Sequence, residues 1–379
     1  MKARNEYVLF ALAALLMTGC SKNSPKVLTI INENGTCMRE ISFHTTPQKL
    51  MLPPDSDLDN RFDKSWERTW TVVDNDSVRH PVPMTEAQYD SIQQKNFRKY
   101  VPDLVTMHVR KEFKNVQEMT EQTPLDETKY IKASSSLDKH FKWFYTDYTF
   151  TETFAYEGEV TLVPISRFLS ADTASYWFTG QPNITRNYSG AELKEMLDGI
   201  EAKVSQWINA NWFAQIYDEI AFDYDSIQNP PVSKDQFVSL RDTLATHPAI
   251  LNTDLLDGSM KDFMNVLDDY YHSSAYSDYI HKWSGGYDSL KREITYLTMV
   301  SFQRDYDLVM PGRVLDAGMG EYDGNVIHYR VSGDRTIPND YKYSITATSR
   351  VANVWAFVVT FLVILLAVGS FFYRRKTKP

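Results

Sequence analysis

The chain has 379 residues, a net charge of −9 and 43% hydrophobic residues, which is enough apolar material for a sizeable core and excludes a disordered stalk. Residues 1–20 carry a charge of +1 and residues 374–379 carry +4, so the body between them carries −14. A body this acidic argues against binding to nucleic-acid phosphates and against recognition of anionic lipid headgroups by a basic patch.

The N-terminus has the features of an export signal. Lys2 and Arg4 precede an apolar run, Val8 to Met17, that is too short for an ordinary spanning helix. The ending Met17-Thr18-Gly19-Cys20 resembles the bacterial lipobox, which implies acylation of Cys20 as the first mature residue. An uncleaved anchor and a plain signal peptide are the alternatives.

Cysteine usage is sparse, because Cys37 is the only thiol besides Cys20. A lipid on Cys20 would leave Cys37 without a disulfide partner. We therefore interpret Cys37 as a small hydrophobic residue in a strand.

The first part of the body favours strands. Val27 to His44 is typical of a hairpin that turns at Asn32-Glu33-Asn34-Gly35. Alternation predicts further strands over Trp66 to Val73 and Leu104 to Phe113, with a short helix over Met84 to Lys95 between them.

The segment Phe141 to Val163 is the most aromatic of the chain and predicts a long strand or hairpin with one apolar face. One parity carries Phe144, Tyr148, Phe150, Phe154 and Tyr156. We expect this face to form core, and the alternative is that it forms the wall of a site for a hydrophobic ligand.

From Ser189 the hydrophobic period changes from two to 3.6. Ser189 with Glu192, and Ser233 with Gln236, each fit a capping box at a helix start. Further helices are predicted over Met260 to Tyr271, Ala275 to Trp283 and Tyr287 to Phe302. This helical block is either an insertion between two halves of one sheet or a separate domain.

Strands return before the end of the chain. They are expected at Tyr306 to Met310, Val314-Leu315, Val326 to Val331 and Tyr341 to Thr348.

Val351 to Tyr373 then runs for 23 residues without a charge, which predicts a transmembrane helix. The tail carries Arg374, Arg375, Lys376 and Lys378, so the positive-inside rule places it in the cytoplasm and the body on the extracytoplasmic, periplasmic side.

The search for catalytic chemistry is mostly negative. The sequence contains no G-x-S-x-G, H-E-x-x-H, C-x-x-C or glycine-rich phosphate loop. Asp268 and His272 are spaced to share a helix face, as a metal site or a general base would need. They belong to an acidic cluster that we interpret as a solvated face: Asp254, Asp257, Asp262, Asp268, Asp269, His272, Asp278 and His281. We predict no catalytic residue, no metal site and no cofactor.

A short pattern, Asp followed by Ser or Thr and then an aliphatic residue, occurs six times. It resembles the O-glycosylation acceptor of exported proteins of Bacteroidota, although helix capping explains some copies. The acceptor residues would be Ser77, Ser91, Thr173, Ser226, Thr243 and Ser289.

The region before the spanning helix is similar to that of LppM-like lipoproteins, which are anchored by a lipid at one end and a helix at the other. The residues that carry this resemblance are Pro311-Gly312-Arg313-Val314, Gly320 and Asp323 to Tyr329, and the turn at Asn32 to Gly35 is placed similarly. The resemblance implies interaction with glycolipid or with the envelope surface, and it provides no catalytic residues.

Together these observations predict an α+β protein with a membrane-proximal antiparallel sheet, a helical subdomain and one C-terminal transmembrane helix. The expected segments are a signal peptide at 1–19, a lipidated tether at 20–26, a β-rich region at 27–170, a helical subdomain at 189–303, returning strands at 304–350, the spanning helix at 351–373 and a basic tail at 374–379. The expected function is non-enzymatic binding or scaffolding at the outer face of the cytoplasmic membrane, with an envelope protein as partner and no nucleic acid. The alternatives are a carrier or sensor for a hydrophobic envelope ligand and a carboxylate-dependent envelope hydrolase.

Overall fold

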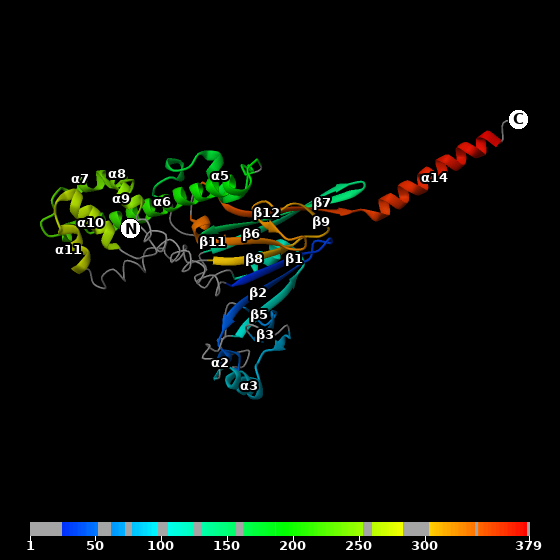
Figure 1. Ribbon diagram of the computed structural model, residues 1–379, viewed down its shortest axis with the longest axis horizontal. Helices are drawn as coiled ribbons and strands as arrows, with labels where there is room; N and C mark the ends of the chain where they lie inside the picture. The colour runs from blue at the N-terminus through cyan, green and yellow to red at the C-terminus, as the bar shows by residue number, and fades with distance from the viewer. Residues whose placement is uncertain are drawn as a thin grey trace.

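The computed structural model describes residues 25–51, 62–72, 78–97, 105–124, 131–156, 162–185, 187–252, 260–282, 303–337 and 340–376. They form a helical block, a central pair of β-sheets and a long C-terminal helix that extends away from the sheets (Figure 1). The chain is therefore a mixed α and β protein with sheets that are mostly antiparallel.

The larger sheet has the strand order β10-β11-β8-β1-β2-β5-β3-β4. Its strands are β1 (Lys26–Ile31), β2 (Cys37–Thr45), β3 (Glu67–Val72), β4 (His80–Pro81), β5 (Val105–Phe113), β8 (Gln303–Val309), β10 (Glu321–Tyr322) and β11 (Ile327–Ser332). The hairpin predicted at β1 and β2 is confirmed. Its turn closes through the Gly35 amide and the Asn32 carbonyl, with Gly35 at φ +92°, a conformation that glycine adopts readily.

One pairing in this sheet differs from the antiparallel expectation, because β1 and β8 are parallel. A parallel pair needs a long crossover connection, and here most of the chain lies between the two strands. The helical block belongs to this connection and is therefore an insertion between two halves of the sheet.

The smaller sheet has the order β6-β7-β12-β9, with β6 (Ile131–Lys142), β7 (Tyr145–Tyr156), β9 (Arg313–Asp316) and β12 (Tyr343–Ala352). The aromatic segment is a hairpin arm, as expected, but the turn lies at Trp143-Phe144 and the hairpin begins as early as Ile131. The sequence pattern of β6 is weak because serine and charged residues occupy most of its positions. On the outer face, hydroxyl groups of β7 and β12 pair in three rungs: Thr149 with Thr348, Thr151 with Thr346 and Thr153 with Ser344.

The two sheets pack face to face over a shared apolar core. Phe150 and Phe154 of β7 and Ile345 of β12 share this core with Val109 of β5 and Tyr306 of β8. The expectation that the aromatic strand forms core is confirmed for these two phenylalanines, which are 0% and 2% exposed. Cys37 lies in the same core, where burial raises the pKa of its thiol to about 11.

Three short helices complete the sheet region: α2 (Pro47–Leu50), α3 (Glu86–Phe97) and α4 (Val116–Glu121). The helix predicted at Met84 to Lys95 is α3. The helix begins at Glu86. Thr85 and Gln88 exchange hydrogen bonds across its first turn, each backbone N–H donating to the other side chain.

The helical block has an apolar core of its own around Trp207, Phe213 and Phe237. Its helices are α5 (Ala171–Thr179), α6 (Gly190–Phe222), α7 (Lys234–Ser239), α8 (Arg241–Ala245), α9 (Pro248–Leu251), α10 (Met260–Tyr271) and α11 (Ala275–Lys282). The helix predicted over Tyr287 to Phe302 lies outside the described residues.

Only one of the two predicted capping boxes forms. Ser233 and Gln236 exchange both bonds at the start of α7. Ser189 precedes α6 as expected but makes no side-chain cap hydrogen bond, and Gly190, the first residue of the helix, has φ +55°.

The block is attached to the smaller sheet through α5. The Arg335 guanidinium lies 4.2 Å from the ring centre of Trp177 on α5 and 5.5 Å from that of Tyr343 on β12. Phe178 of α5 also stacks on Tyr341, with 6.1 Å between ring centres. These contacts connect the insertion to the strand that leads into the C-terminal helix.

Candidate membrane junction

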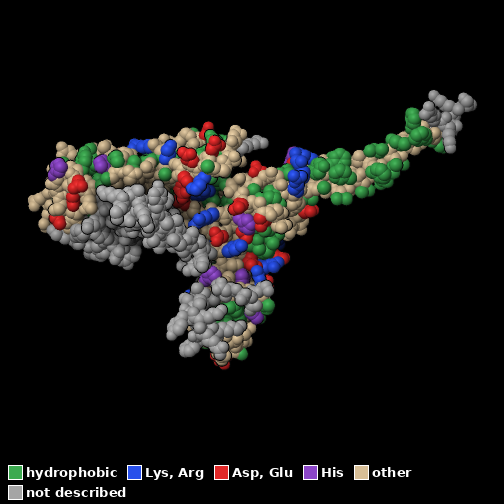
Figure 2. All heavy atoms as spheres, viewed as in Figure 1, with side chains coloured by type: hydrophobic (Ala, Val, Ile, Leu, Met, Phe, Trp, Pro, Cys, Tyr) green, Lys and Arg blue, Asp and Glu red, His purple; other side chains and the backbone are tan. Residues whose placement is uncertain are grey.

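The C-terminal helix α14 (Val354–Lys376) follows β12 after a single connecting residue, Asn353. Within the described part of the chain, it holds the one stretch long and apolar enough to cross a membrane, the 20 residues Val354–Tyr373. Its side chains are almost all exposed, and Figure 2 shows hydrophobic side chains along its length. The core helix of a soluble protein would be mostly buried, so the exposure of this apolar surface is compatible with membrane anchoring.

Asn353 bonds the start of α14 to the tip of the β6–β7 hairpin. Its backbone N–H donates to the Phe144 carbonyl at 2.9 Å, and its side-chain amide donates to the carbonyls of Lys142 (2.8 Å) and Trp143 (3.2 Å). Its side-chain oxygen accepts from the Thr146 hydroxyl at 2.9 Å. A short polar side chain at position 353 thus satisfies carbonyls of the turn.

Aromatic side chains continue this contact along the first turns of α14. The Trp143 ring N–H donates to the Thr360 hydroxyl at 2.9 Å, and the Trp143 ring meets Trp355 edge-on, with 5.3 Å between centres. Phe144 packs on Phe357 with 4.7 Å between centres. We call residues 141–145 and 353–360 together the junction.

A charged cluster lies beside the junction, at the end of the smaller sheet. Asp147 accepts from Arg350 at 2.6 and 3.0 Å and from Lys142 at 2.7 Å. Hydrogen bonds from Arg350, and then from Lys142, hold the pKa of Asp147 well below its usual range. Lys and Arg side chains gather where α14 leaves the sheets in Figure 2.

The residues of the predicted ligand wall do not form one surface. Tyr148, Phe150 and Phe154 are buried between the sheets, whereas Phe144 lies in the turn and packs on α14. The side chain of Tyr156 lies outside the described residues.

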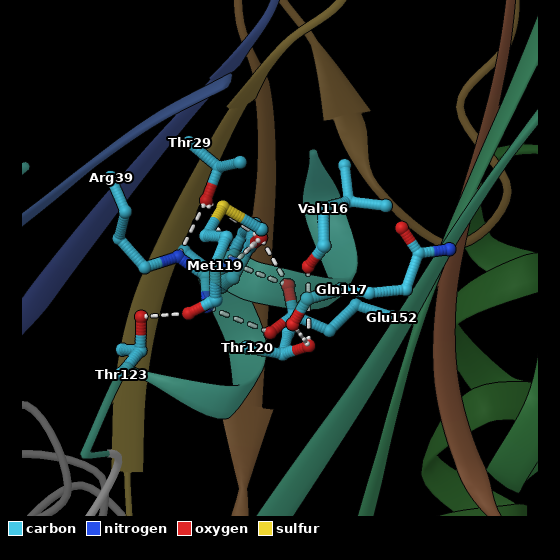
Figure 3. Close-up of polar contacts among 9 residues, drawn as sticks. Thr29, Arg39, Val116, Gln117, Met119, Thr120, Thr123 and Glu152 are labelled. Carbon is cyan, nitrogen blue, oxygen red and sulfur yellow. Dashed lines mark hydrogen bonds and ion pairs between the residues drawn. The ribbon is translucent and has the colours of Figure 1, made fainter. Parts of the chain in front are cut away.

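A buried charge cluster between the sheets was not predicted. Arg39 of β2 donates to both carboxylate oxygens of Glu152 on β7 at 3.0 and 2.6 Å, and both side chains are 0% exposed (Figure 3). Arg39 also donates to Thr29 and to the Tyr306 hydroxyl, and Tyr306 donates to Glu152. Arg39 and Glu152 each occupy a position on the otherwise apolar face of its strand. A charged residue at such a position is the sequence signal that could have indicated the pair.

The electrostatics of this cluster are those of a closed structural ion pair. Burial is the largest single influence and lowers the pKa of Arg39, but attraction to Glu152 and Tyr306 and the hydrogen bonds to Glu152 together outweigh it, so the pKa is raised. Burial raises the pKa of Tyr306 well above its ordinary value. The neighbouring hydroxyls of Thr120 and Thr123 in Figure 3 donate to carbonyls of helix α4 and take no part in the pair.

Asp268 and His272 do not share a helix face. Helix α10 ends at Tyr271, and His272 beyond it adopts φ +51°, so the expected spacing of one helical turn is lost. Asp268 instead accepts a hydrogen bond from Ser277 of α11. Asp254 and Asp257, and the side chains of Asp262 and His281, lie outside the described residues, and the described residues contain no group of three or more metal-ligating side chains.

The predicted modification sites fall in different environments. Ser91, Ser226 and Thr243 are exposed. Thr173 is half-buried in the first turn of α5, where its hydroxyl bonds to that of Ser170 at 2.8 Å. The remaining predicted sites, Cys20, Ser77 and Ser289, lie outside the described residues.

Comparison with known proteins identified no relatives: no family model, no curated protein and no solved structure matches this chain. The resemblance to LppM-like lipoproteins therefore stays a prediction.

Proposed function

We propose that this chain is a non-enzymatic envelope lipoprotein that holds its body as a binding or scaffolding module at the outer face of the cytoplasmic membrane. The observation that carries the proposal is the junction. An exposed apolar helix of spanning length follows directly from a sheet strand and is bonded to a neighbouring hairpin through Asn353 and Trp143. Because the helix is bonded to the hairpin at several points, the sheets would be held in one orientation above the membrane rather than tethered by a flexible linker.

The composition of the two ends supports the sidedness and the second anchor. The cations at residues 374–378 favour a cytoplasmic tail, and the lipobox-like ending at Cys20 favours a lipid at the other end. The partner we propose is an envelope protein, because the body charge of −14 disfavours nucleic acid and basic-patch lipid binding.

The interior of the described sheets supports a structural role for the aromatic strand. Phe150 and Phe154 pack in the core between the two sheets, and the Arg39–Glu152 pair is fully buried and hydrogen-bonded to protein groups. These contacts favour a scaffold over the carrier alternative, in which part of the aromatic wall would face a ligand.

Protease digestion of intact spheroplasts, followed by carbonate extraction of their membranes, tests the proposal. We expect protease added outside to digest the body and to leave an epitope on the tail after Lys378 protected. Deleting residues 354–379 should leave the body on the membrane through Cys20, because a diacylated cysteine supplies two chains. Combining that deletion with Cys20→Ser should release the body.

Two results would contradict the proposal. The topology is wrong if the external protease spares the body and removes the tail epitope. The lipid anchor is wrong if the deletion alone releases the body. If neither result is found, cross-linking in intact membranes followed by affinity capture of the full chain would identify the partner.

A further inference from the structure

We propose that the tip of the β6–β7 hairpin, residues 141–145, is a second membrane-contact element whose aromatic side chains enter the bilayer beside α14. This inference rests on the proposed insertion of α14 and adds a lipid contact for a different part of the chain. Three tip side chains are substantially exposed despite their contacts with the helix: Phe141, Trp143 and Tyr145.

The length of α14 places the membrane surface. At 1.5 Å per residue, the 20 residues from Val354 to Tyr373 span about 30 Å, which equals the thickness of the hydrocarbon core. The stretch has no residues to spare, so one edge of the hydrocarbon must lie near Val354.

The contact between Trp143 and Thr360 then places the hairpin. Thr360 follows Val354 by six residues, which puts it roughly 9 Å deeper along the helix. The Trp143 ring nitrogen lies 2.9 Å from the Thr360 hydroxyl, so the ring must share the depth of the first helical turns. Moving the membrane edge down to Thr360 would leave Phe361 to Tyr373, only about 20 Å of helix, too short to cross.

The chemistry of the tip suits this depth. Asn353 donates to the carbonyls of Lys142, Trp143 and Phe144, so the turn backbone stays at the level of the helix start and these three carbonyls are satisfied. Only side chains reach further. Rings of Trp and Tyr, apolar with one polar atom, are favoured at the edge of the bilayer.

Charge placement is consistent with this orientation. Lys142 at the tip and Arg350 on β12 both bond to Asp147, which lies on β7 behind the tip, at the height expected for headgroups and water. A bilayer is the favoured occupant for the exposed rings, since Phe141 and Trp143 both contact Trp355 on the apolar surface of α14. Two contacts with the membrane, rather than one, would fix the tilt and rotation of the body.

Spin-label accessibility in lipid vesicles tests the proposal on the full chain. Single cysteines replace Phe141 or Trp143 at the tip, Leu366 within the span, and Asp138 on β6 as the matched control. Asp138 is exposed and lies roughly 13 Å before Lys142 along the same strand. Cys20→Ser serves as the background, and Cys37 should not react because it is buried with a pKa raised to about 11.

We expect labels at 141, 143 and 366 to collide often with dissolved oxygen and rarely with a water-soluble nickel complex. The label at 138 should collide more often with the nickel complex than with oxygen. A lipid-like signal at 366 with a water-like signal at both 141 and 143 would overturn the hairpin inference and leave the spanning helix intact. A water-like signal at 366 would instead overturn the proposed function. Shielding of 141 and 143 from both reagents would show that protein covers the tip, which also overturns the inference. The Phe141 label leaves the Trp143–Thr360 bond in place, so the test does not depend on one substitution.

Discussion

Replacing Arg39 by Met should destabilise the two sheets strongly, because it leaves the Glu152 carboxylate buried without its cation. Arg39 provides both bonds between the two charged groups, and among the described side chains only the Tyr306 hydroxyl would still donate to Glu152. Removing one member of a buried ion pair costs about 3–5 kcal/mol.

An independent route gives the same magnitude and adds a pH dependence. A glutamic acid side chain in water has a pKa of about 4.3, so taking up a proton at pH 7 to avoid the buried charge costs roughly 3.7 kcal/mol. The folded variant would then hold one more proton than its unfolded chain, so its stability should fall as pH rises. At pH 5 the same cost is roughly 1 kcal/mol, and the variant should recover most of its stability.

The double variant Arg39→Met with Glu152→Met is the decisive comparison. Thr29 and Tyr306 remain satisfied in it because their hydroxyls already bond to one another at 2.8 Å. Apolar replacement of both members of a buried pair is often neutral or stabilising, so we expect the double variant to be more stable than Arg39→Met alone.

Hydrogen-exchange mass spectrometry of peptides from β2 and β7 measures this effect without interference from the helical block. Arg110→Met is the control, since the Arg110–Glu112 pair on β5 is exposed and such pairs contribute about 0–1 kcal/mol. The reasoning is refuted if Arg39→Met costs no more than Arg110→Met, or if the double variant is no better than the single one.

Three further outcomes are expected. Phe150→Ala should lower the free energy of unfolding by about 3–5 kcal/mol, because the ring is fully buried, whereas Phe222→Ala on the exposed end of α6 should lower it little. A folded Phe150→Ala protein that has lost a co-purified lipid would instead favour the carrier alternative. His328 bonds to Asp307 and Asp323, which raise its pKa from 6.5. Its stabilising contribution is therefore complete below about pH 6.5 and disappears as pH rises through the raised pKa. His328→Gln should remove that pH dependence from urea unfolding curves, and an unchanged pH profile would contradict the prediction. In a host with the matching glycosylation system, the intact mass should exceed the polypeptide mass, and changing the six predicted acceptors to Ala should remove the excess; an unmodified wild-type mass would end this hypothesis.

Local pattern was sufficient for much of the fold. The Asn32–Gly35 turn, the strand β5, the helix α10 and the capping box at Ser233 depend on residues close together in the chain, and each formed where the sequence predicts it. The same holds for the apolar length of α14, which composition alone determines.

Tertiary structure decided what depends on distant partners. The parallel pairing of β1 with β8 and the strand β6, with its weak pattern, follow from neighbours elsewhere in the chain. Arg39 and Glu152 are 113 residues apart, and Trp143 and Thr360 are 217 apart. The hydrophobic periodicity of the sequence does not predict such contacts, because each side chain meets its partner only after the sheets have assembled. The sequence therefore predicts an anchored body, and only the assembled sheets show how the hairpin and the helix are joined.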